Sequence, residues 1–255
     1  MDAYLDALEK EMTQCKEWLA GKQMVSVYVG GGTPTSLSEE QFERLMAMTE
    51  KYLPMEQSKE FTVEAGRPDS ITEGKLRSMK THGVTRISIN PQSMKEHTLE
   101  LLGRKHTVEE IREKFMLART LGFDNINMDL IAGLPEETLE DFKETLREVE
   151  ALKPDSITVH TLVIKRASRL RKEQLEQGGE MREEDACIEP MQKEAEQFCR
   201  VHGYEPYYMY RQKNKAGTTR NTNQENVAYA KPGKECLYNT LIMEEWETIA
   251  ALGSG

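Results

Sequence analysis

The chain has 255 residues, which suffices for one substantial hydrophobic core with a smaller appendage. Its 34 Lys and Arg residues against 44 Asp and Glu residues give a net charge of −10, which argues against a nucleic-acid partner because little would neutralise phosphates. Charged residues make up 31% of the sequence, above the usual ~25%, so exposed helices are expected.

Membrane insertion and a local metal motif are not expected. No stretch approaches the ~20 apolar residues of a membrane helix, and no hydrophobic leader is present, so a cytoplasmic protein is expected. The four cysteines, Cys15, Cys187, Cys199 and Cys236, form no C-x-x-C or C-x-x-x-C-x-x-C run, so no metal site is predicted. Cys15 and Cys199 fall in apolar helical stripes, where buried structural thiols are expected.

Helical patterns and apolar strand-like runs alternate along the first part of the chain. Apolar residues at helical spacing over 4–19 predict an opening helix that stops at Gly21. Later helices are predicted to begin at capping boxes, formed by Ser38 with Gln41 and by Thr107 with Glu110. The predicted strands are 25–29, 61–63, 84–89, 126–131 and 157–162.

Five strands separated by helices predict a parallel sheet with right-handed crossovers. Such a sheet is either open and doubly wound or curved into a full or partial barrel. From about residue 165 the pattern changes to a charged helical region, an aromatic cluster at 204–210 and a polar segment at 212–224. We therefore expect an α/β unit over 1–164 and a mixed α+β appendage over 165–255.

Candidate functional residues follow the predicted strands, because parallel α/β folds place their sites at the carboxyl ends of strands. The sharpest signal is the glycine run GGGTPT at 30–35, whose backbone can approach a ligand closely. A tight turn without a ligand is the alternative. The run matches neither a phosphate loop nor G-x-G-x-x-G. The other strand ends carry Glu64, Gln92, Asp129 and His160.

Together these side chains suit an amino-acid nucleoside. Glu64 and Asp129 are carboxylates at a shared mouth, although each alone is also typical of a solvated loop. Arg104 can bring a guanidinium fork to a carboxylate. Gln92 and Asp129 are suited to ribose hydroxyls. The set thus offers an acid for an ammonium group, an arginine for a carboxylate and polar groups for a sugar.

Four ordered motifs, and two later ones, resemble a known family. They are VYVGGGTPT (27–35), TVEA (62–65), ISINPQ (87–92) and NMDLIAGLPE (127–136), followed by YYMYRQK (207–213) and NVAYAKPGKECLYN (226–239). In order and spacing they resemble the oxygen-independent coproporphyrinogen III dehydrogenases among the radical S-adenosylmethionine enzymes. The last two resemble the Gram-positive-type coproporphyrinogen dehydrogenase-like subgroup. The resemblance spans essentially the whole chain apart from 215–222.

This resemblance implies a partial (β/α)6 barrel that binds S-adenosylmethionine beside a 4Fe–4S cluster. The family's C-x-x-x-C-x-x-C loop follows a first strand upstream of the helix that begins here near residue 2. We therefore expect the first strand and the cluster loop to be missing, and the chain to be truncated at both ends. The cofactor-binding residues that the resemblance implies are Gly31, Gly32, Thr33, Glu64, Gln92, Arg104, Asp129 and, beside the adenine, Val163.

The implied reaction is the oxygen-independent oxidative decarboxylation of two coproporphyrinogen III propionates to vinyl groups, with flavodoxin or ferredoxin as electron donor. The chain alone is expected to be inactive, because it lacks the cluster cysteines. Arg166, Arg169 and Arg171 are candidates for propionate contacts, with a solvated helix start as the alternative. A haem chaperone or other haem-handling protein and a non-catalytic remnant stay open. The chaperone branch carries a His-Asn pair followed by Tyr-Trp, whereas the comparable place here reads CLYN at 236–239.

Overall fold

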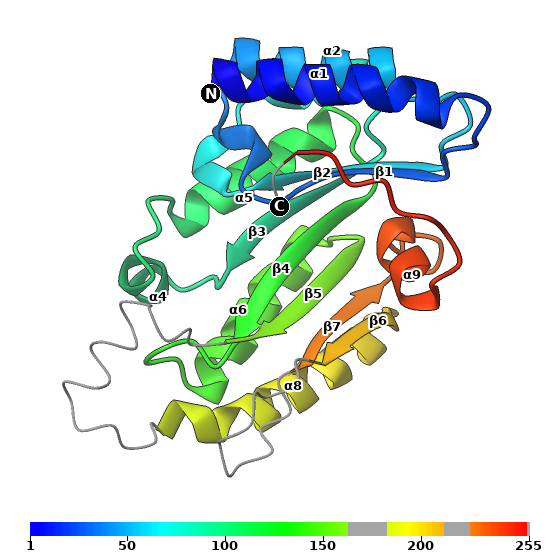
Figure 1. Ribbon diagram of the computed structural model, residues 1–255. Coiled ribbons are helices and arrows are strands. Elements are labelled where there is room, and N and C mark those ends of the chain that lie inside the picture. Colours follow the sequence, from blue (N-terminus) through cyan, green and yellow to red (C-terminus); the bar gives the residue numbers. More distant parts are fainter. Residues whose placement is uncertain (163–182, 212–224, 254–255) are drawn as a thin grey trace, which may run out of the picture.

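One curved β-sheet organises the computed structural model, which describes residues 1–162, 183–211 and 225–253 (Figure 1). Its seven strands within these residues follow the order β1-β2-β3-β4-β5-β7-β6. They are β1 (Ser26–Val29), β2 (Glu60–Gly66), β3 (Arg86–Gln92), β4 (Ile126–Ala132), β5 (Ser156–Thr161), β6 (Glu205–Arg211) and β7 (Glu225–Ala230).

Helices connect most of these strands. The α-helices are α1 (Asp2–Leu19), α2 (Glu39–Tyr52), α3 (Glu73–Thr81), α4 (Glu96–Leu101), α5 (Val108–Thr120), α6 (Leu139–Leu152), α8 (Glu183–Val201) and α9 (Leu237–Glu244). Two short 3₁₀ turns, η1 (Pro34–Ser36) and η2 (Pro68–Ser70), follow β1 and β2. In Figure 1, α1 and α2 run side by side above β1 and β2.

The predicted parallel sheet is confirmed, since β1 to β5 pair in sequence order and in parallel. Each predicted strand overlaps an observed one, but β2 is longer than 61–63 and β3 lies at 86–92 rather than 84–89. The prediction followed apolar runs and therefore left out polar residues that also belong to the strands. Both predicted capping boxes are present, and Thr138 with Asp141 forms a third.

The appendage contributes strands to the same sheet. β7 pairs antiparallel with both β5 and β6, so the sheet continues past its parallel part. These two strands belong to the predicted mixed appendage, although the sequence pattern alone did not indicate them. The predicted boundary at 164/165 and the candidates Arg166, Arg169 and Arg171 lie outside the described residues, as does part of the predicted helical region after 165.

The burial of the helix residues corrects the prediction for one thiol. Leu5 and Met12 of α1 are buried, but Tyr4 and Trp18 are 42% and 51% exposed, because they flank the buried stripe. Among the thiols, Cys199 is buried as predicted, whereas the Cys15 residue is only partly buried.

The two faces of the sheet differ in chemistry. Residues such as Val63, Ile87 and Met128 point to the helices and are fully buried in the hydrophobic core. Because strand side chains alternate between faces, the intervening residues point to the concave face. These residues are almost all polar in the parallel strands: Ser26, Tyr28, Glu60, Thr62, Glu64, Arg86, Ser88, Asn90, Asn127, Asp129, Ser156, Thr158 and His160.

Helix α9 links the two edges of this sheet. It contacts β1 and β6, the first and last strands in the sheet order (Figure 1). Buried Glu60 of β2 accepts hydrogen bonds from the backbone N–H groups of Leu237 (2.8 Å) and Tyr238 (3.1 Å), at the start of α9. A carboxylate at a helix N-terminus is favourable because it satisfies unpaired N–H donors. The sheet is thus a half-barrel whose open side is spanned by α9.

Candidate functional site

The glycine run forms the turn that leaves β1. A Cβ atom added at Gly30 would lie 2.5 Å from Tyr28 Cε1 and 3.0 Å from the Glu64 carboxyl carbon, so only glycine fits there. Gly31 has φ = +100°, which L side chains rarely adopt. Nothing lies within 4 Å of a Cβ added at Gly31 or Gly32. Glycine is therefore needed for packing at the first position and for conformation at the second, and the space above the turn is open.

The next residue ties this turn to the end of β2. Thr33 packs against Gly66, where an added Cβ would lie only 2.8 Å from Thr33 Cγ2 and where φ is +68°. The glycine run therefore lies at the carboxyl end of β2, near Glu64. The backbone of Gly31 also hydrogen-bonds the Glu64 carboxylate.

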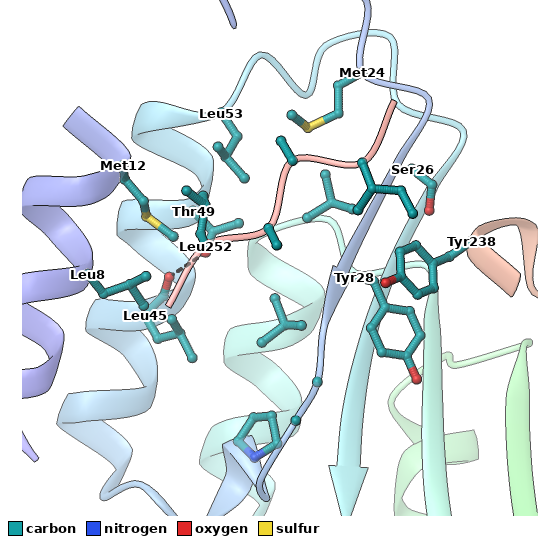
Figure 2. A pocket seen from close by; sticks show the side chains of 18 of the residues that line it. Leu8, Met12, Met24, Ser26, Tyr28, Leu45, Thr49, Leu53, Tyr238 and Leu252 are labelled. Carbon is teal, nitrogen blue, oxygen red and sulfur yellow. Dashed lines mark hydrogen bonds between the residues drawn. The ribbon is translucent and has the colours of Figure 1, made fainter. Parts of the chain in front are cut away.

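Glu64 is held by Tyr28, whose ring in turn stacks on a second tyrosine. Tyr28 Oη donates a 2.6 Å hydrogen bond to Glu64 Oε1. The Tyr28 ring stacks on Tyr238 of α9 with ring centroids 4.5 Å apart, and Figure 2 shows the two rings side by side. Burial raises the pKa of the Glu64 carboxyl, the nearby charge of Asp129 raises it further, and the Tyr28 hydrogen bond opposes both. Burial likewise raises the pKa of Tyr28, which stays a neutral donor.

Asp129 is held between Asn127 and His160. Asn127 Nδ2 donates to Asp129 Oδ1 (2.7 Å), and its Oδ1 accepts from Ser156 Oγ (2.9 Å), so the amide is fixed. His160 Nε2 lies 3.8 Å from Asp129 Oδ2. Burial lowers the pKa of His160, but its contacts with Asp129 and Asn226 outweigh burial and raise it above its ordinary value.

Arg104 and Gln92 are the two other predicted site residues with polar side chains. Arg104 follows α4 and is partly buried, and its guanidinium forms no hydrogen bond or ion pair with any described residue. Burial and the charge of Arg67 lower its pKa, and Asp69 opposes them. Gln92 ends β3 in a left-handed conformation (φ = 69°) and is buried. For a residue other than glycine this conformation is uncommon and often occurs at functional sites.

The structure therefore gathers most of the predicted site at one end of the sheet. Glu64 and Asp129 lie close enough for their charges to interact, and the glycine run lies beside Glu64. Arg104 lies near Arg67 and Asp69, which follow β2. Val163 lies outside the described residues. That these side chains bind a cofactor stays a prediction.

Sequence reasoning missed the residues that hold the acids. Tyr28 and Asn127 lie inside strands and Tyr238 lies far along the chain, so strand ends alone did not point to them. Their alternation with apolar neighbours was the available signal, since Tyr28 lies between Val27 and Val29 and Asn127 between Ile126 and Met128.

A large apolar cavity of about 1140 Å³ extends from this turn along β1. Leu8 and Met12 of α1, Leu45 of α2 and Tyr28 of β1 line it, and Figure 2 shows these side chains around the chain segment that carries Leu252. On this side β1 has no strand partner among the described residues. The glycine run also lines this cavity.

No group of three or more His, Cys, Asp or Glu side chains that could hold a metal ion occurs within residues 1–162, 183–211 and 225–253. Cys15 lies on α1, Cys199 on α8 and Cys236 at the start of α9. None of the helices in the described part of the chain is long and apolar enough to cross a membrane.

Comparison with known proteins gives the family. The model of the radical SAM superfamily matches residues 3–149, which is more than half of the chain. The chain belongs to the radical SAM superfamily. Members of this superfamily use S-adenosylmethionine and a 4Fe–4S cluster.

Curated relatives carry haem-related names. The chain is 45% identical over 256 residues to the oxygen-independent coproporphyrinogen-III oxidase-like protein HemZ of Bacillus subtilis, covering 99% of this chain and 50% of HemZ. It is 38% identical over 165 residues to the haem chaperone HemW of the same organism, covering 64% of this chain and 43% of HemW. The chain thus spans about half the length of the curated relatives it matches.

Solved structures agree with the radical SAM fold. Coproporphyrinogen III oxidase (HemN) from Escherichia coli, a radical SAM enzyme, matches with a TM-score of 0.74 and 25% identity, over 95% of this chain and 51% of that chain. The radical S-adenosylmethionine methyltransferase TsrM from Kitasatospora setae matches at 0.56 with 14% identity, over 90% of this chain and 41% of that chain, which shows the fold alone. The predicted partial radical SAM barrel is confirmed.

Proposed function

We propose that this chain is the cofactor-binding part of a radical S-adenosylmethionine enzyme that converts coproporphyrinogen III to protoporphyrinogen IX without oxygen, in haem biosynthesis. One observation carries the proposal: the carboxyl ends of the half-barrel strands combine an open glycine turn, two carboxylates and an arginine that has no partner within the described part of the chain. The 45% identity to the coproporphyrinogen-III oxidase-like HemZ supports the choice of reaction.

S-adenosylmethionine fits the residues present. Its ammonium group matches Glu64, its carboxylate matches Arg104, and its ribose hydroxyls match Gln92 and Asp129. The open space above Gly31 and Gly32 leaves room for the ligand beside the backbone. When bound and reduced, S-adenosylmethionine supplies the radical that removes hydrogen from an unactivated C–H bond, which no side-chain acid or base can do.

The chain's own residues prepare the pocket for this cofactor. Tyr28 orients the Glu64 carboxylate and favours its ionised form, which an ammonium group requires. Asn127 fixes one oxygen of Asp129 and leaves the carboxylate facing the concave side. Helix α9 spans the open side of the half-barrel and limits the access of water to Tyr28 and Glu64.

A 4Fe–4S cluster does not fit the cysteines of the described residues. Cys199 and Cys236 are buried on separate helices, and burial raises the pKa of the Cys199 thiol to about 12 and that of Cys236 to about 11. A cluster needs thiolates, and both shifts oppose thiolate formation. We therefore propose that cluster ligands come from a part of the protein beyond these residues.

A haem-handling role is the second candidate, because the chain is 38% identical to the haem chaperone HemW over 165 residues. It would use the same barrel without decarboxylating a substrate. We further propose that the protein works in the cytoplasm with a small-molecule substrate and with an electron donor such as flavodoxin or ferredoxin. Neither a nucleic acid nor a membrane is part of this proposal.

An anaerobic activity assay separates the two candidates. A protein that carries this chain together with a three-cysteine loop is reconstituted with iron and sulfide, then given dithionite, S-adenosylmethionine and coproporphyrinogen III. We expect 5′-deoxyadenosine and protoporphyrinogen IX, the latter detected as protoporphyrin after oxidation. Cleavage of S-adenosylmethionine without protoporphyrinogen, together with stoichiometric haem binding, would instead favour the haem-handling role.

A further inference from the structure

Four charged or titratable side chains cluster where β2 ends. Arg67 and Asp69 belong to the turn that follows β2, and Arg104 and His106 belong to the segment between α4 and α5. The helix α5 that follows His106 packs against η2, which contains Asp69, so the two segments are held together. Of these four residues, the proposed function uses Arg104 alone.

The Asp69 carboxylate is already occupied. Arg67 Nε donates to Asp69 Oδ1 (3.0 Å) and Arg67 Nη2 donates to Asp69 Oδ2 (2.8 Å), so both carboxylate oxygens are engaged by one guanidinium fork. Paired hydrogen bonds of this kind fix direction as well as distance. Asp69 is therefore held in one orientation by its neighbour in the same turn.

Arg104 lies near Arg67 and Asp69, but it forms no hydrogen bond or ion pair with any described residue. Its charge interacts with both Arg67 and Asp69, which shows that the three groups are near one another. A partly buried arginine beside a carboxylate would ordinarily form an ion pair with it. The fork from Arg67 already engages both Asp69 oxygens, so an ion pair with Arg104 would have to share them.

His106 also lies near Asp69. Its side chain is fully buried, and Nδ1 lies 3.6 Å from Asp69 Oδ1, which is too far for a hydrogen bond. Both ring nitrogens lack a hydrogen-bond partner. Burial and the charge of Arg104 lower the pKa of His106, so the ring is neutral and does not compete for the carboxylate as a cation.

We propose that Arg67 and His106 are positioning residues, which hold Asp69 away from Arg104 and thereby keep Arg104 free for the carboxylate of an amino-acid nucleoside. The identity of the ligand rests on the proposed function. The state of Arg104 does not, because it follows from the contacts of Asp69. Removing the fork of Arg67 would let Asp69 turn to Arg104 and neutralise it.

The test compares two ligands that differ only in the amino-acid part. S-adenosylhomocysteine carries the ammonium and carboxylate groups, whereas 5′-methylthioadenosine lacks both. Calorimetry on Arg67→Met should show about tenfold weaker binding of S-adenosylhomocysteine with unchanged binding of 5′-methylthioadenosine, because the loss corresponds to one charged hydrogen bond. The double variant Arg67→Met/Asp69→Asn should recover the wild-type ratio of the affinities for the two ligands, because the neutral Asn side chain cannot neutralise Arg104.

A matched control and a ligand-free readout complete the design. Arg77→Met removes an exposed arginine of α3 that donates two hydrogen bonds to Glu73, and it should leave the ratio of the two affinities unchanged. Phenylglyoxal labelling of Arg104, followed by mass spectrometry, should slow in Arg67→Met and recover in the double variant. Folded His106→Gln should lower the ratio to a smaller extent.

Three results would overturn the proposal: an equal loss of both ligands in Arg67→Met, no recovery in the double variant, or unchanged labelling of Arg104. An unchanged ratio in folded His106→Gln would remove His106 from it. If the wild-type chain binds neither nucleoside, the proposed cofactor site fails, and the labelling still decides whether Arg67 keeps Arg104 free.

Discussion

Two carboxylates share the concave mouth of the half-barrel at a cost in electrostatic energy. Glu64 is partly buried and feels the charge of Asp129, and both effects raise the pKa of its carboxyl. The largest opposing contribution to the pKa is the hydrogen bond from Tyr28. Opposing influences on the pKa of one buried carboxyl are typical of binding sites, where a charged ligand group stabilises the ionised form. The ammonium group of the proposed cofactor would do so here.

Tyr28→Phe removes a single oxygen, the donor to Glu64, and so tests how this hydrogen bond affects the Glu64 pKa. The phenyl ring keeps the stacking on Tyr238 but removes the donor, so the pKa of Glu64 should rise further, and binding of S-adenosylmethionine should begin at a higher pH. Carbon NMR of the Glu64 carboxyl checks the shift. Tyr52→Phe is the control, because Tyr52 donates to Glu9 (3.1 Å), away from the site. A lower Glu64 pKa in Tyr28→Phe would contradict this account.

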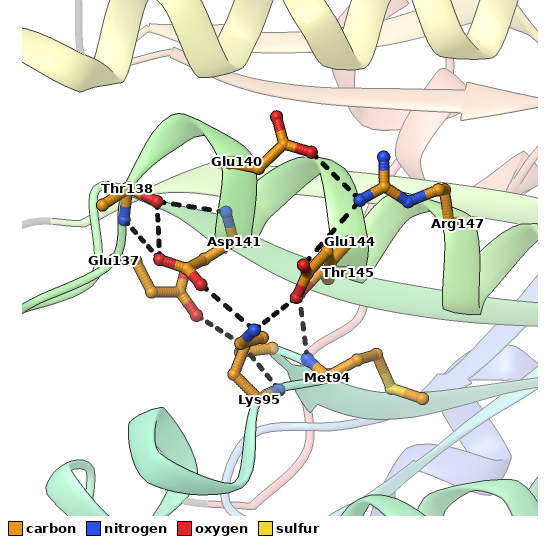
Figure 3. A network of polar contacts seen from close by, with 10 residues as sticks. Met94, Lys95, Glu137, Thr138, Glu140, Asp141, Glu144, Thr145 and Arg147 are labelled. Carbon is orange, nitrogen blue, oxygen red and sulfur yellow. Dashed lines mark hydrogen bonds and ion pairs between the residues drawn. The ribbon is translucent and has the colours of Figure 1, made fainter.

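At the scale of an element, the start of α6 is fixed to the strand beside it. Asp141 completes the capping box with Thr138, and Lys95 from the segment after β3 lies between Asp141 (3.1 Å) and Glu144, as Figure 3 shows. Hydrogen bonds from Thr138 lower the pKa of Asp141 to about 2. The helix start is thereby joined to the carboxyl end of β3, where Gln92 lies.

Asp141→Asn should therefore destabilise the protein in a pH-dependent way. A depressed pKa contributes stability above the unfolded value of about 3.9 and loses it as the pH falls toward 2. We expect a loss of about 1 kcal/mol in the free energy of unfolding at pH 7, reduced by solvent screening, and almost none near pH 2. Urea unfolding at several pH values measures it.

The control for that measurement lies on the same helix. Glu140→Gln removes an exposed partner of Arg147 (3.1 Å) and should change stability little. An Asp141→Asn loss that stays constant from pH 7 to pH 2 would show that packing, not charge, is responsible.

The elements differ in how far the sequence could predict them. The parallel strands carry buried apolar residues on one face, and the capping boxes are local, so both were readable. β6 and β7 were not assigned, because their pairing joins residues on either side of a polar segment and depends on the free edge of β5. The contact between Glu60 and the start of α9 spans most of the chain and has no local signature.

The candidate site was predictable only in part for the same reason. The glycine run follows β1, Glu64 lies in the carboxyl-terminal half of β2 and Asp129 at the middle of β4, so a search near the predicted strand ends found them. Tyr28 was hidden within an apolar strand, and its partner Tyr238 depends on how α9 closes the half-barrel. Long-range packing of this kind produces no periodic pattern of residue types in the sequence.

On the scale of the whole molecule, the outer edge of β1 is the place where the fold can be extended. We predict that a strand with a three-cysteine loop, fused before Met1, pairs with β1, binds a 4Fe–4S cluster and allows reductive cleavage of S-adenosylmethionine. Thermal stability should rise as well, because the strand covers unpaired backbone groups. Without the fused segment, anaerobic reconstitution should give no cluster that survives desalting.

The fusion also tests the glycine run. Gly31→Val would combine loss of ligand space with backbone strain, because φ there is +100°. Gly32→Val is the cleaner change, since its φ is not positive and nothing lies within 4 Å of an added Cβ. We expect cleavage to be abolished while the cluster spectrum stays. Full cleavage in Gly32→Val would mean that the run is only a turn.

Calorimetric binding of S-adenosylmethionine to this chain tests the central claim most directly. Glu64→Ala, Arg104→Ala and Asp129→Ala each remove a charged partner, so each should weaken binding by about 1.5–3 kcal/mol, or roughly 10- to 150-fold. Arg77→Ala changes an exposed side chain of α3 and should bind like the wild type. Unchanged affinity in folded Glu64→Ala and Asp129→Ala would contradict the site.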